Sequence, residues 1–344
     1  MPTEALTRAI DALASRRDLS QADAGAVLAE IMAGNATDAE IAGVLIALRT
    51  KGETEDELAG LAGTMRAMAT PVRTGRRDLV DTAGTGGGRP TFNVSTTAAL
   101  IAAGAGCAVA KHGNRSATGL SGSADVLEAL GARITLPPPM VARCIDEAGF
   151  GFMFAPAHHA ATRYVVPVRK ALAVRTIFNV LGPLTNPAGA RRQLIGVSDP
   201  AMLDVMAGAL ARLGVDRALV VSGDDGLDEV TLSTRTHVVE VNGTELRRWI
   251  LSPADVGLPE APYEALTGGV PAVNADITRR ILSGEDGPRR DLAVLNAGAA
   301  IYAAGRAEDV ADGVRVAGEA IASGAAREAL DGYVALSREG EGQP

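Results

Sequence analysis

Cysteine and long apolar runs are scarce in this chain of 344 residues. Its two cysteines, Cys107 and Cys144, lack metal-ligand spacing, so we interpret them as small buried side chains in a reducing compartment. No apolar run approaches the ~18 residues that span a bilayer. The opening residues, MPTEALTRAIDAL, form an acidic amphipathic pattern without the features of a signal peptide. We therefore expect a cytoplasmic protein that does not enter a membrane.

Positive charge is limited too, because the chain has a formal net charge of −8 and a pI of about 5.2. Proteins that bind nucleic acids or membrane surfaces usually present a net basic face. The acidic balance argues against both as general partners, although it is compatible with a local basic pocket. Only three lysines occur, Lys51, Lys111 and Lys170, so a lysine inside a motif is notable.

Aromatic residues make up only 3% of the chain, yet 47% is hydrophobic, which is typical of a globular core built on alanine and glycine. The length suits one large domain or two smaller ones. The N-terminal part has helical patterns only, with capping boxes at Thr37-x-x-Glu40 and Thr54-x-x-Glu57. We expect residues 1–72 to form a helical subdomain. Its remaining apolar surface packs either on the rest of the core or on a second subunit.

From Asp78 onward, short apolar strands alternate with helices. The strand candidates are residues 79–82, 107–110, 133–136, 151–154, 194–197 and 218–222, followed by a β-ribbon over 231–251 with its turn at Asn242-Gly243. This alternation predicts an α/β fold, with residues 73–344 forming a large domain around a mainly parallel sheet. A helical segment around 160–190 is expected to return to the first subdomain. Residues from Asn274 onward are predicted to be helical.

The most informative stretch is residues 81–95, DTAGTGGGRPTFNVS, with four glycines between a predicted strand and a predicted helix. Glycine lets the backbone approach a ligand closely, and the N-terminus of a helix favours anions. A tight strand-to-helix turn is the simpler interpretation. The flanking hydroxyl and amide groups favour a phosphate or a hydrated metal instead, and they belong to Thr85, Thr91, Asn93, Ser95 and Thr96.

A second polar stretch, Lys111-His-Gly-Asn-Arg115, follows the strand predicted over residues 107–110. Lysine holds phosphate as a point charge and arginine as a fork. The next loop, residues 116–123, is rich in hydroxyls and leads into another predicted helix. One basic residue after a strand would most simply be solvated surface. Two adjacent loops of this kind favour binding of phosphate or pyrophosphate.

Carboxylates and histidines supply two further candidate groups. Asp228 and Glu229 lie in SGDDGLDEV after a predicted strand, and such a pair suits Mg²⁺ beside phosphate groups, although alone it would read as an acidic surface turn. His158 and His159 lie near Arg169 in the helical return. No cysteine or carboxylate lies at metal-ligand spacing from the histidines, so the sequence does not favour a metal site there. Arg169 is well suited to bind a substrate carboxylate.

Six motifs, in the order GTGG, KHGNR, SGSADVLEALG, FAPAHH, RTIFNVLGPLTNPA and GLDE, resemble the anthranilate phosphoribosyltransferase family. The resemblance extends from the N-terminal helices to about Ala326. It implies an N-terminal helical subdomain and a large α/β domain, shared in outline with class II nucleoside phosphorylases. It also implies a homodimer formed through the helical subdomains.

The resemblance implies the ligands of this family, phosphoribosyl pyrophosphate, anthranilate and Mg²⁺. The residues implied for phosphoribosyl pyrophosphate are Gly84, Thr85, Gly86, Gly87, Thr91, Asn93, Ser95, Thr96, Lys111 and Ser123. Those implied for anthranilate are Gly84, Asn114, His159, Arg169 and Gly182, and those implied for Mg²⁺ are Ser95, Asp228 and Glu229. No residue is assigned as a general acid or base. Gly86, Gly87 and Lys111 would stabilise the departing pyrophosphate.

The chain departs from the family pattern in two places. Gly88 stands where the family usually has aspartate, in a loop one residue shorter, and Arg89 follows it. Leu120 replaces a residue that is commonly lysine or polar. Two alternatives stay open: a transferase or nucleoside phosphorylase of the same fold with another acceptor, and a non-catalytic relative that binds nucleic acid. The acidic pI and the scarcity of lysine disfavour the second.

Overall fold

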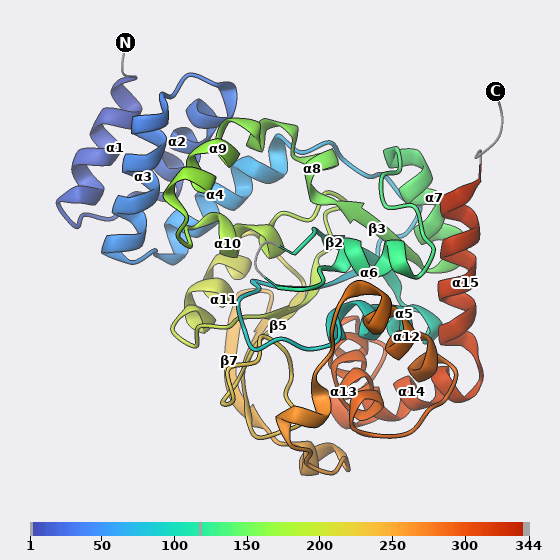
Figure 1. Cartoon of the computed structure of the whole chain (residues 1–344). Helices are drawn as coiled ribbons and strands as arrows, with labels where there is room; N and C mark the ends of the chain where they lie inside the picture. The colour runs from blue at the N-terminus through green and yellow to red at the C-terminus, as the bar shows by residue number, and fades with distance from the viewer. Residues whose placement is uncertain (1–2, 117–118, 340–344) are drawn as a thin grey trace.

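The structure is a computed structural model that describes residues 3–116 and 119–339. Its first four helices form the bundle coloured blue in Figure 1: α1 (Glu4–Ala14), α2 (Gln21–Ala33), α3 (Asp38–Lys51) and α4 (Glu55–Ala67). Both predicted capping boxes are confirmed. The hydroxyl oxygens of Thr37 and Thr54 each accept the backbone N–H of the glutamate three residues later, and the carboxylate of that glutamate accepts the backbone N–H of the threonine. These caps fix where α3 and α4 begin. No helix in the described ranges is long and apolar enough to cross a membrane.

A seven-stranded sheet runs through the rest of the molecule in the order β3-β2-β1-β4-β5-β6-β7. Its strands are β1 (Leu79–Gly84), β2 (Ala108–Gly113), β3 (Phe150–Phe154), β4 (Arg192–Gly196), β5 (Arg217–Gly223), β6 (Thr236–Asn242) and β7 (Glu245–Leu251). The pairs among β1 to β5 are all parallel, whereas β6 and β7 pair antiparallel. The mainly parallel sheet and the terminal ribbon are thus confirmed.

Two strand predictions need correction. Residues 133–136 form no strand, because the backbone of Arg133 bonds to side chains of a C-terminal helix: its N–H donates to Ser337 Oγ, and its carbonyl accepts from Tyr333. The alternating pattern reflects burial of Ile134 and Leu136 in the larger apolar core rather than sheet pairing. The second strand also runs further than predicted, to Gly113, so Lys111 is part of β2 and not of a loop.

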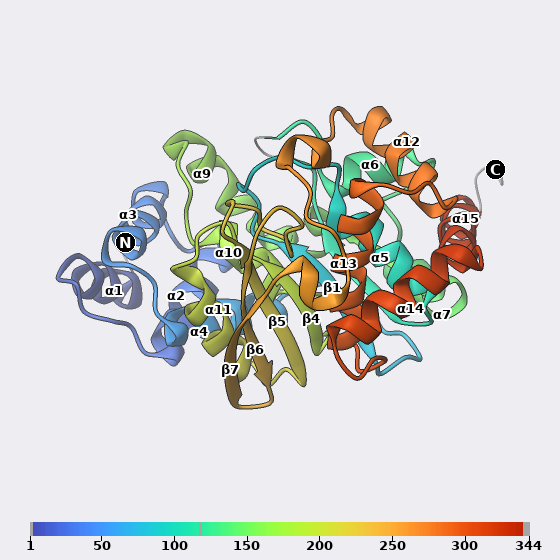
Figure 2. The same ribbon diagram turned by 90° about the horizontal axis from the view of Figure 1, so that it is seen from below.

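Helices cover both faces of the sheet (Figures 1 and 2). The remaining helices are α5 (Val94–Gly104), α6 (Ser123–Ala129), α7 (Pro138–Ala148), α8 (Ala155–His158), α9 (Val166–Leu172), α10 (Phe178–Leu181), α11 (Met202–Arg212), α12 (Pro271–Leu282), α13 (Pro288–Ala303), α14 (Val310–Ala322) and α15 (Ala325–Arg338). One apolar core joins α5, α7 and α12–α15 to one face, and a second joins α1–α4 and α11 to the other. The bundle is joined to the sheet through α11, which packs on α4 on one side and on β5 and β6 on the other.

The segment from α8 to α10 runs back to the bundle. In both views α9 lies beside α3, and Arg49 of α3 donates from Nη1 to the carbonyl of Arg175 at 2.8 Å. Val165 and Val168 are buried in the same core as the bundle helices. This return brings the residues between α9 and α10 to the carboxyl edge of the sheet, where β1 ends.

Candidate active site

The glycine loop connects β1 to α5 at the carboxyl edge of the sheet, where parallel α/β folds place their ligands. Three residues of the loop have positive φ: Gly86 at 65°, Gly87 at 84° and Asn93 at 66°. Glycine adopts this conformation without a steric cost, and asparagine tolerates it better than most residues. Asn93 immediately precedes α5, so the loop leads into a helix N-terminus as predicted.

The acidic turn after β5 is fastened to this loop. Asp228 Oδ2 accepts the backbone N–H of Gly86 at 3.0 Å, and Glu229 Oε1 accepts that of Ser95 at 3.2 Å. Burial raises the pKa of Asp228. Burial, and then the neighbouring Asp228, raise the pKa of Glu229 to about 8. Two adjacent carboxylates in this setting repel each other, and a cation between them would relieve the repulsion.

The donor atoms at this point suit a hard cation. Asp228, Glu229 and the Ser95 hydroxyl offer oxygen only, which is the ligand type that Mg²⁺ prefers. Within residues 3–116 and 119–339 there is no cluster of three or more histidine, cysteine or acidic side chains that could hold a metal ion. A cation here would therefore take its other ligands from substrate phosphate and water, as Mg²⁺ usually does.

Two successive residues of β2, Lys111 and His112, lie in different regions of the site, because the side chains of a strand alternate between the two faces of the sheet. Lys111 is buried and its Nζ lies 3.2 Å from Thr82 Oγ1 and 3.4 Å from Ser95 Oγ, beneath the glycine loop. Its pKa is lowered by burial. His112 is directed to the opposite side, where its Nδ1 lies 3.1 Å from the carbonyl of Gly182.

His112 and His159 form a buried pair on that second side, with ring centroids 5.1 Å apart in an edge arrangement. Burial lowers the pKa of His112 to about 3 and that of His159 to about 4, so both rings are neutral at pH 7. Since a carbonyl can only accept, His112 Nδ1 is the protonated nitrogen and Nε2 carries a lone pair. Within the described part of the chain, His112 Nε2 and both His159 nitrogens have no hydrogen-bond partner.

A buried carboxylate supports the histidine side of β2. Asp81 of β1 accepts the backbone N–H of His112 at 3.1 Å and Asn186 Nδ2 at 2.7 Å. Burial raises its pKa to about 6, although Lys111 opposes that shift. Asp81 therefore ties together β1, β2 and the loop that carries Gly182.

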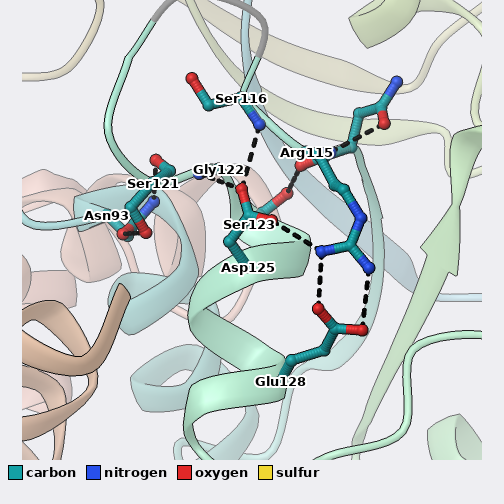
Figure 3. A network of polar contacts seen from close by, with 9 residues as sticks. Asn93, Arg115, Ser116, Ser121, Gly122, Ser123, Asp125 and Glu128 are labelled. Carbon is teal, nitrogen blue, oxygen red and sulfur yellow. Dashed lines mark hydrogen bonds and ion pairs between the residues drawn. The ribbon is translucent and has the colours of Figure 1, made fainter. Parts of the chain in front are cut away.

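The second predicted phosphate loop has a different role in the structure (Figure 3). Arg115 pairs with Asp125 at 2.7 Å and with Glu128 at 2.6 Å, so its fork is occupied by carboxylates. Asp125 also accepts the N–H groups of Gly122 and Ser116, at 2.8 and 3.2 Å, which places an anion at the start of α6 already. In this structure the fork of Arg115 and the first turn of α6 are thus paired with carboxylates, and a second phosphate site at this helix stays a prediction. Residues 117 and 118 lie outside the described residues.

The same loop instead braces the glycine loop. Asn93 Nδ2 donates to the carbonyl of Ser121 at 2.9 Å, and Asn93 Oδ1 accepts from Ser121 Oγ at 2.8 Å, as Figure 3 shows. Asn93 Oδ1 also accepts from Nδ2 of the buried Asn274 at 2.8 Å. Three segments therefore meet at the side chain of Asn93.

The other predicted residues have varied surroundings. Thr85 is buried at the base of the loop, its Oγ1 3.4 Å from the N–H of Ser198, and Thr96 is buried in the first turn of α5. Arg169 lies over the ring of Phe178, 5.5 Å from its centroid. Thr91 is half-buried, and the Ser123 hydroxyl donates to the carbonyl of Asn114. No atom lies near the position that a side chain on Gly182 would occupy. No hydrogen bond among the described residues joins Arg169 to the histidine pair.

Several hydrogen bonds at the site are not predicted by the sequence patterns. Arg175 donates from Nη1 to the carbonyl of Gly86 at 2.9 Å, and Ser198 donates to the same oxygen at 3.1 Å. The buried Asn296 holds both backbone groups of Val230, directly after the acidic pair. A polar residue inside an apolar pattern, such as Asp81 or Asn296, is a sequence signal for a buried side chain that makes hydrogen bonds. The partners of Arg175 and Ser198 depend on tertiary contacts that no local pattern encodes.

Comparisons with known proteins agree with this architecture. Residues 7–69 match the helical bundle domain of a glycosyl transferase family, and residues 76–327 match its α/β domain. The anthranilate phosphoribosyltransferase of Chloroflexus aggregans is 54% identical over 336 residues, which cover 97% of this chain and 98% of that protein. The enzyme of the same name from Roseiflexus is 54% identical over 328 residues, covering 94% and 96% of the two chains.

Solved structures give the same result. The anthranilate phosphoribosyltransferase of Thermus thermophilus aligns with a TM-score of 0.92 at 48% identity and covers 98% of this chain and 100% of its own. That of Saccharomyces cerevisiae, solved with phosphoribosyl pyrophosphate and magnesium, aligns with a TM-score of 0.88 at 28% identity, covering 97% and 98%. The fold, the order of the motifs and these full-length matches lead to one conclusion. The chain belongs to the anthranilate phosphoribosyltransferase family.

Proposed function

We propose that the chain transfers the phosphoribosyl group of phosphoribosyl pyrophosphate to the amine of anthranilate and releases pyrophosphate, a step of tryptophan biosynthesis. One observation carries this proposal: strand β2 contributes residues to two chemically different regions. One region is a glycine loop fastened to two carboxylates, and the other is a buried pair of neutral histidines. A charged sugar-phosphate donor suits the first region. An uncharged aromatic amine suits the second.

On the donor side, the positive-φ glycines expose backbone at the end of β1, and the N-terminus of α5 faces the same space. We assign Gly84, Thr85, Gly86, Gly87, Thr91, Asn93, Ser95, Thr96, Lys111 and Ser123 to phosphoribosyl pyrophosphate. Negative charge grows on pyrophosphate as its bond to the ribose breaks. Backbone N–H groups fixed in place before the reaction stabilise that charge without the cost of reorganising.

Ser95, Asp228 and Glu229 would hold Mg²⁺, since Glu229 accepts the N–H of Ser95, and burial, then the neighbouring Asp228, raises the pKa of Glu229. Bound there, Mg²⁺ would supply Lewis-acid stabilisation to the leaving pyrophosphate. The remaining contribution comes from the chain. Asp228 keeps the glycine loop in place through Gly86, and Asn296 fixes the backbone that follows the pair.

On the acceptor side, we assign Gly84, Asn114, His159, Arg169 and Gly182 to anthranilate, with the Arg169 guanidinium on its carboxylate. An aromatic amine attacks in its neutral form. The low pKa values of His112 and His159 keep both rings uncharged, so they would add no repulsion to the positive charge that grows on the ribose.

We also propose a homodimer formed through the helical bundle, in the cytoplasm. Exposed apolar side chains on the bundle and the adjacent return support the dimer, and they include Ile46, Val166 and Val174. Sedimentation at micromolar concentration tests it. A monomer that stays fully active would contradict the proposal.

Acceptor identity is the part of the function that needs a direct experiment. The purified protein is mixed with Mg²⁺, phosphoribosyl pyrophosphate and one acceptor, and the products are identified by mass. We expect phosphoribosylated anthranilate with one pyrophosphate released per turnover. Transfer to another aromatic amine but not to anthranilate would favour a relative with a different acceptor. Cleavage of nucleosides by inorganic phosphate would favour a phosphorylase.

A further inference from the structure

We propose that Arg175 is a donor-binding residue: its guanidinium rests on the glycine loop in the free protein and transfers to the pyrophosphate of the sugar donor when that donor binds. The inference rests on the proposed function, because it requires a pyrophosphate at this loop. Arg175 is the first residue of the motif RTIFNVLGPLTNPA, and the inference gives it a contact with the donor that the sequence patterns did not assign.

The position of Arg175 is set from two sides. Its Nη1 donates to the carbonyl of Gly86 at 2.9 Å, while its own carbonyl accepts from Arg49 Nη1 of α3 at 2.8 Å. Gly86 in turn donates its N–H to Asp228 at 3.0 Å. A continuous series of hydrogen bonds therefore runs from the helical bundle, through Arg175, to the proposed metal ligands.

Gly87 provides the space for this contact. An ideal Cβ built on Gly87 would lie 1.7 Å from Arg175 Nη1, so the guanidinium would have to move away. The guanidinium thus occupies the place of a side chain at position 87. The φ of 84° favours glycine at position 87, and a side chain there would also displace the guanidinium.

The charges around the loop single out Arg175. Lys111 is buried beneath the loop and already contacts Thr82 and Ser95. Arg89 is turned toward the ring of Tyr263, with its Cζ 3.5 Å from the centroid. Arg175 is exposed, lies over the backbone of Gly86 and Gly87, and its only hydrogen bond from the side chain, among the described residues, goes to a neutral carbonyl.

Exchange of that carbonyl for pyrophosphate is favourable, because a guanidinium binds phosphate through charge-assisted paired hydrogen bonds. The guanidinium also has room to move. A cavity of about 200 Å³ adjoins it, lined by residues that include Arg49, Glu53 and Ser198. Since Arg49 holds the backbone of Arg175, donor binding would also reach α3 and the bundle.

The test measures donor binding directly, by calorimetry with phosphoribosyl pyrophosphate and Mg²⁺ in the absence of anthranilate. Arg175→Ala should raise the dissociation constant about tenfold or more, the usual effect of losing a charged hydrogen bond. Arg175→Lys keeps the charge but not the forked guanidinium. Its dissociation constant should lie between those of the unmodified protein and Arg175→Ala. In steady-state assays the KM for the donor should rise, while the KM for anthranilate stays within about twofold.

Gly87→Ala is a second route to the same outcome, because the new methyl group displaces the guanidinium. Combined with Arg175→Ala, it should weaken donor binding by less than the product of the two single effects, as expected for groups in contact. Arg315→Ala, which removes an exposed guanidinium from α14, is the charge-matched control and should bind the donor like the unmodified protein. Melting temperatures identify any variant that is merely unfolded, and Arg175→Lys then serves as the test.

Donor binding by Arg175→Ala that equals that of the unmodified protein would overturn the inference and leave the proposed function intact. Equal weakening in Arg175→Ala and Arg315→Ala would overturn it as well, because the effect would then be one of overall charge. If the unmodified protein itself bound no phosphoribosyl pyrophosphate, the proposed function would fail and the inference with it.

Discussion

Asp228 accepts the backbone N–H of Gly86 at 3.0 Å, so the acidic turn after β5 and the glycine loop form one unit. The carboxylate therefore has two separable tasks. Its charge offers a site for a cation, and its oxygen fixes the conformation of the loop. Asparagine keeps an acceptor oxygen and loses the charge, whereas alanine loses both.

Asp228→Asn should therefore raise the Mg²⁺ concentration needed for half-maximal activity by about tenfold or more while leaving the donor KM at saturating Mg²⁺ little changed. Asp228→Ala should raise both, because Gly86 also loses its partner. Glu229→Gln should resemble Asp228→Asn. Titrations of activity against Mg²⁺ decide the matter, and unchanged Mg²⁺ dependence in all three variants would place the ion elsewhere.

Gly88 is one of the two positions, with Leu120, at which we expect this chain to depart from the family pattern. An ideal Cβ there would lie 2.5 Å from Asp228 Oδ1 and 2.9 Å from the carbonyl of Gly226. We expect Gly88→Ala and Gly88→Asp to displace Asp228 and lower kcat/KM for the donor by about tenfold or more. Gly318→Ala, at a glycine with ample space on α14, is the control. Full activity of Gly88→Asp would show that the loop adapts and that its contact with Asp228 does not require glycine.

Asn274 should matter to the donor site without touching the donor. It is buried, donates to Asn93 Oδ1 at 2.8 Å and accepts the N–H of Gly269 at 2.7 Å. Asn274→Ala should cost about 1–3 kcal/mol of unfolding free energy by leaving these groups unpaired. It should also raise the KM of the donor more than that of anthranilate. Asn35→Ala removes an exposed hydrogen bond as a control, and equal losses in both variants would refute the assignment.

Arg169→Ala should raise the KM for anthranilate at least about tenfold and that for the sugar donor far less, because the guanidinium is assigned to the anthranilate carboxylate. The neighbouring Lys170 is exposed on the same helix, so Lys170→Ala controls for loss of one positive charge. Steady-state kinetics with each substrate varied in turn provide the measurement. Similar effects of Arg169→Ala on both substrates would remove Arg169 from the acceptor site.

The buried histidines predict how stability changes with pH. His159 has a folded pKa lowered to about 4, whereas an unfolded imidazole titrates near ~6.5. Between these values the unfolded chain binds more protons, so the free energy of unfolding falls as the pH drops, by up to ~1.4 kcal/mol per unit for each such histidine. The pKa of His112, lowered to about 3, acts in the same direction.

Urea unfolding at pH 7 and pH 5 measures this decline. The decline should be smaller in His159→Gln than in the unmodified protein, because one titrating group has been removed. His237→Gln replaces an exposed histidine and should keep the full decline. If His159→Gln lost stability with pH as steeply as the unmodified protein, protonation of His159 would not be its cause.

Most of the fold could be predicted from the sequence because the signals were local. Capping boxes at Thr37 and Thr54 fix two helix starts, and alternation of strands with helices implies a parallel sheet. The prediction failed at residues 133–136, whose apolar alternation is the same whether the partner is a strand or α15. Hydrophobic periodicity indicates which residues are buried. Which element covers them depends on the tertiary structure.

The candidate site was predicted in part for a similar reason. Spacing along the chain brought out Gly86, Asp228 and Glu229, and the structure joins them. Arg115 was predicted to hold phosphate, but its partners, Asp125 and Glu128, are only visible once α6 is folded beside it. The roles of the predicted ligand-binding residues stay predictions until substrates are bound.

Transfer between donor and acceptor across β2, dependent on Mg²⁺, is best tested by the decay of anthranilate fluorescence. The decay is followed with protein, Mg²⁺ and phosphoribosyl pyrophosphate present, and again without each component in turn. We expect a decay that requires all of them and that the double variant Asp228→Asn, Glu229→Gln abolishes. Stable fluorescence at high protein concentration, or a decay that persists without phosphoribosyl pyrophosphate, would contradict the proposed transfer.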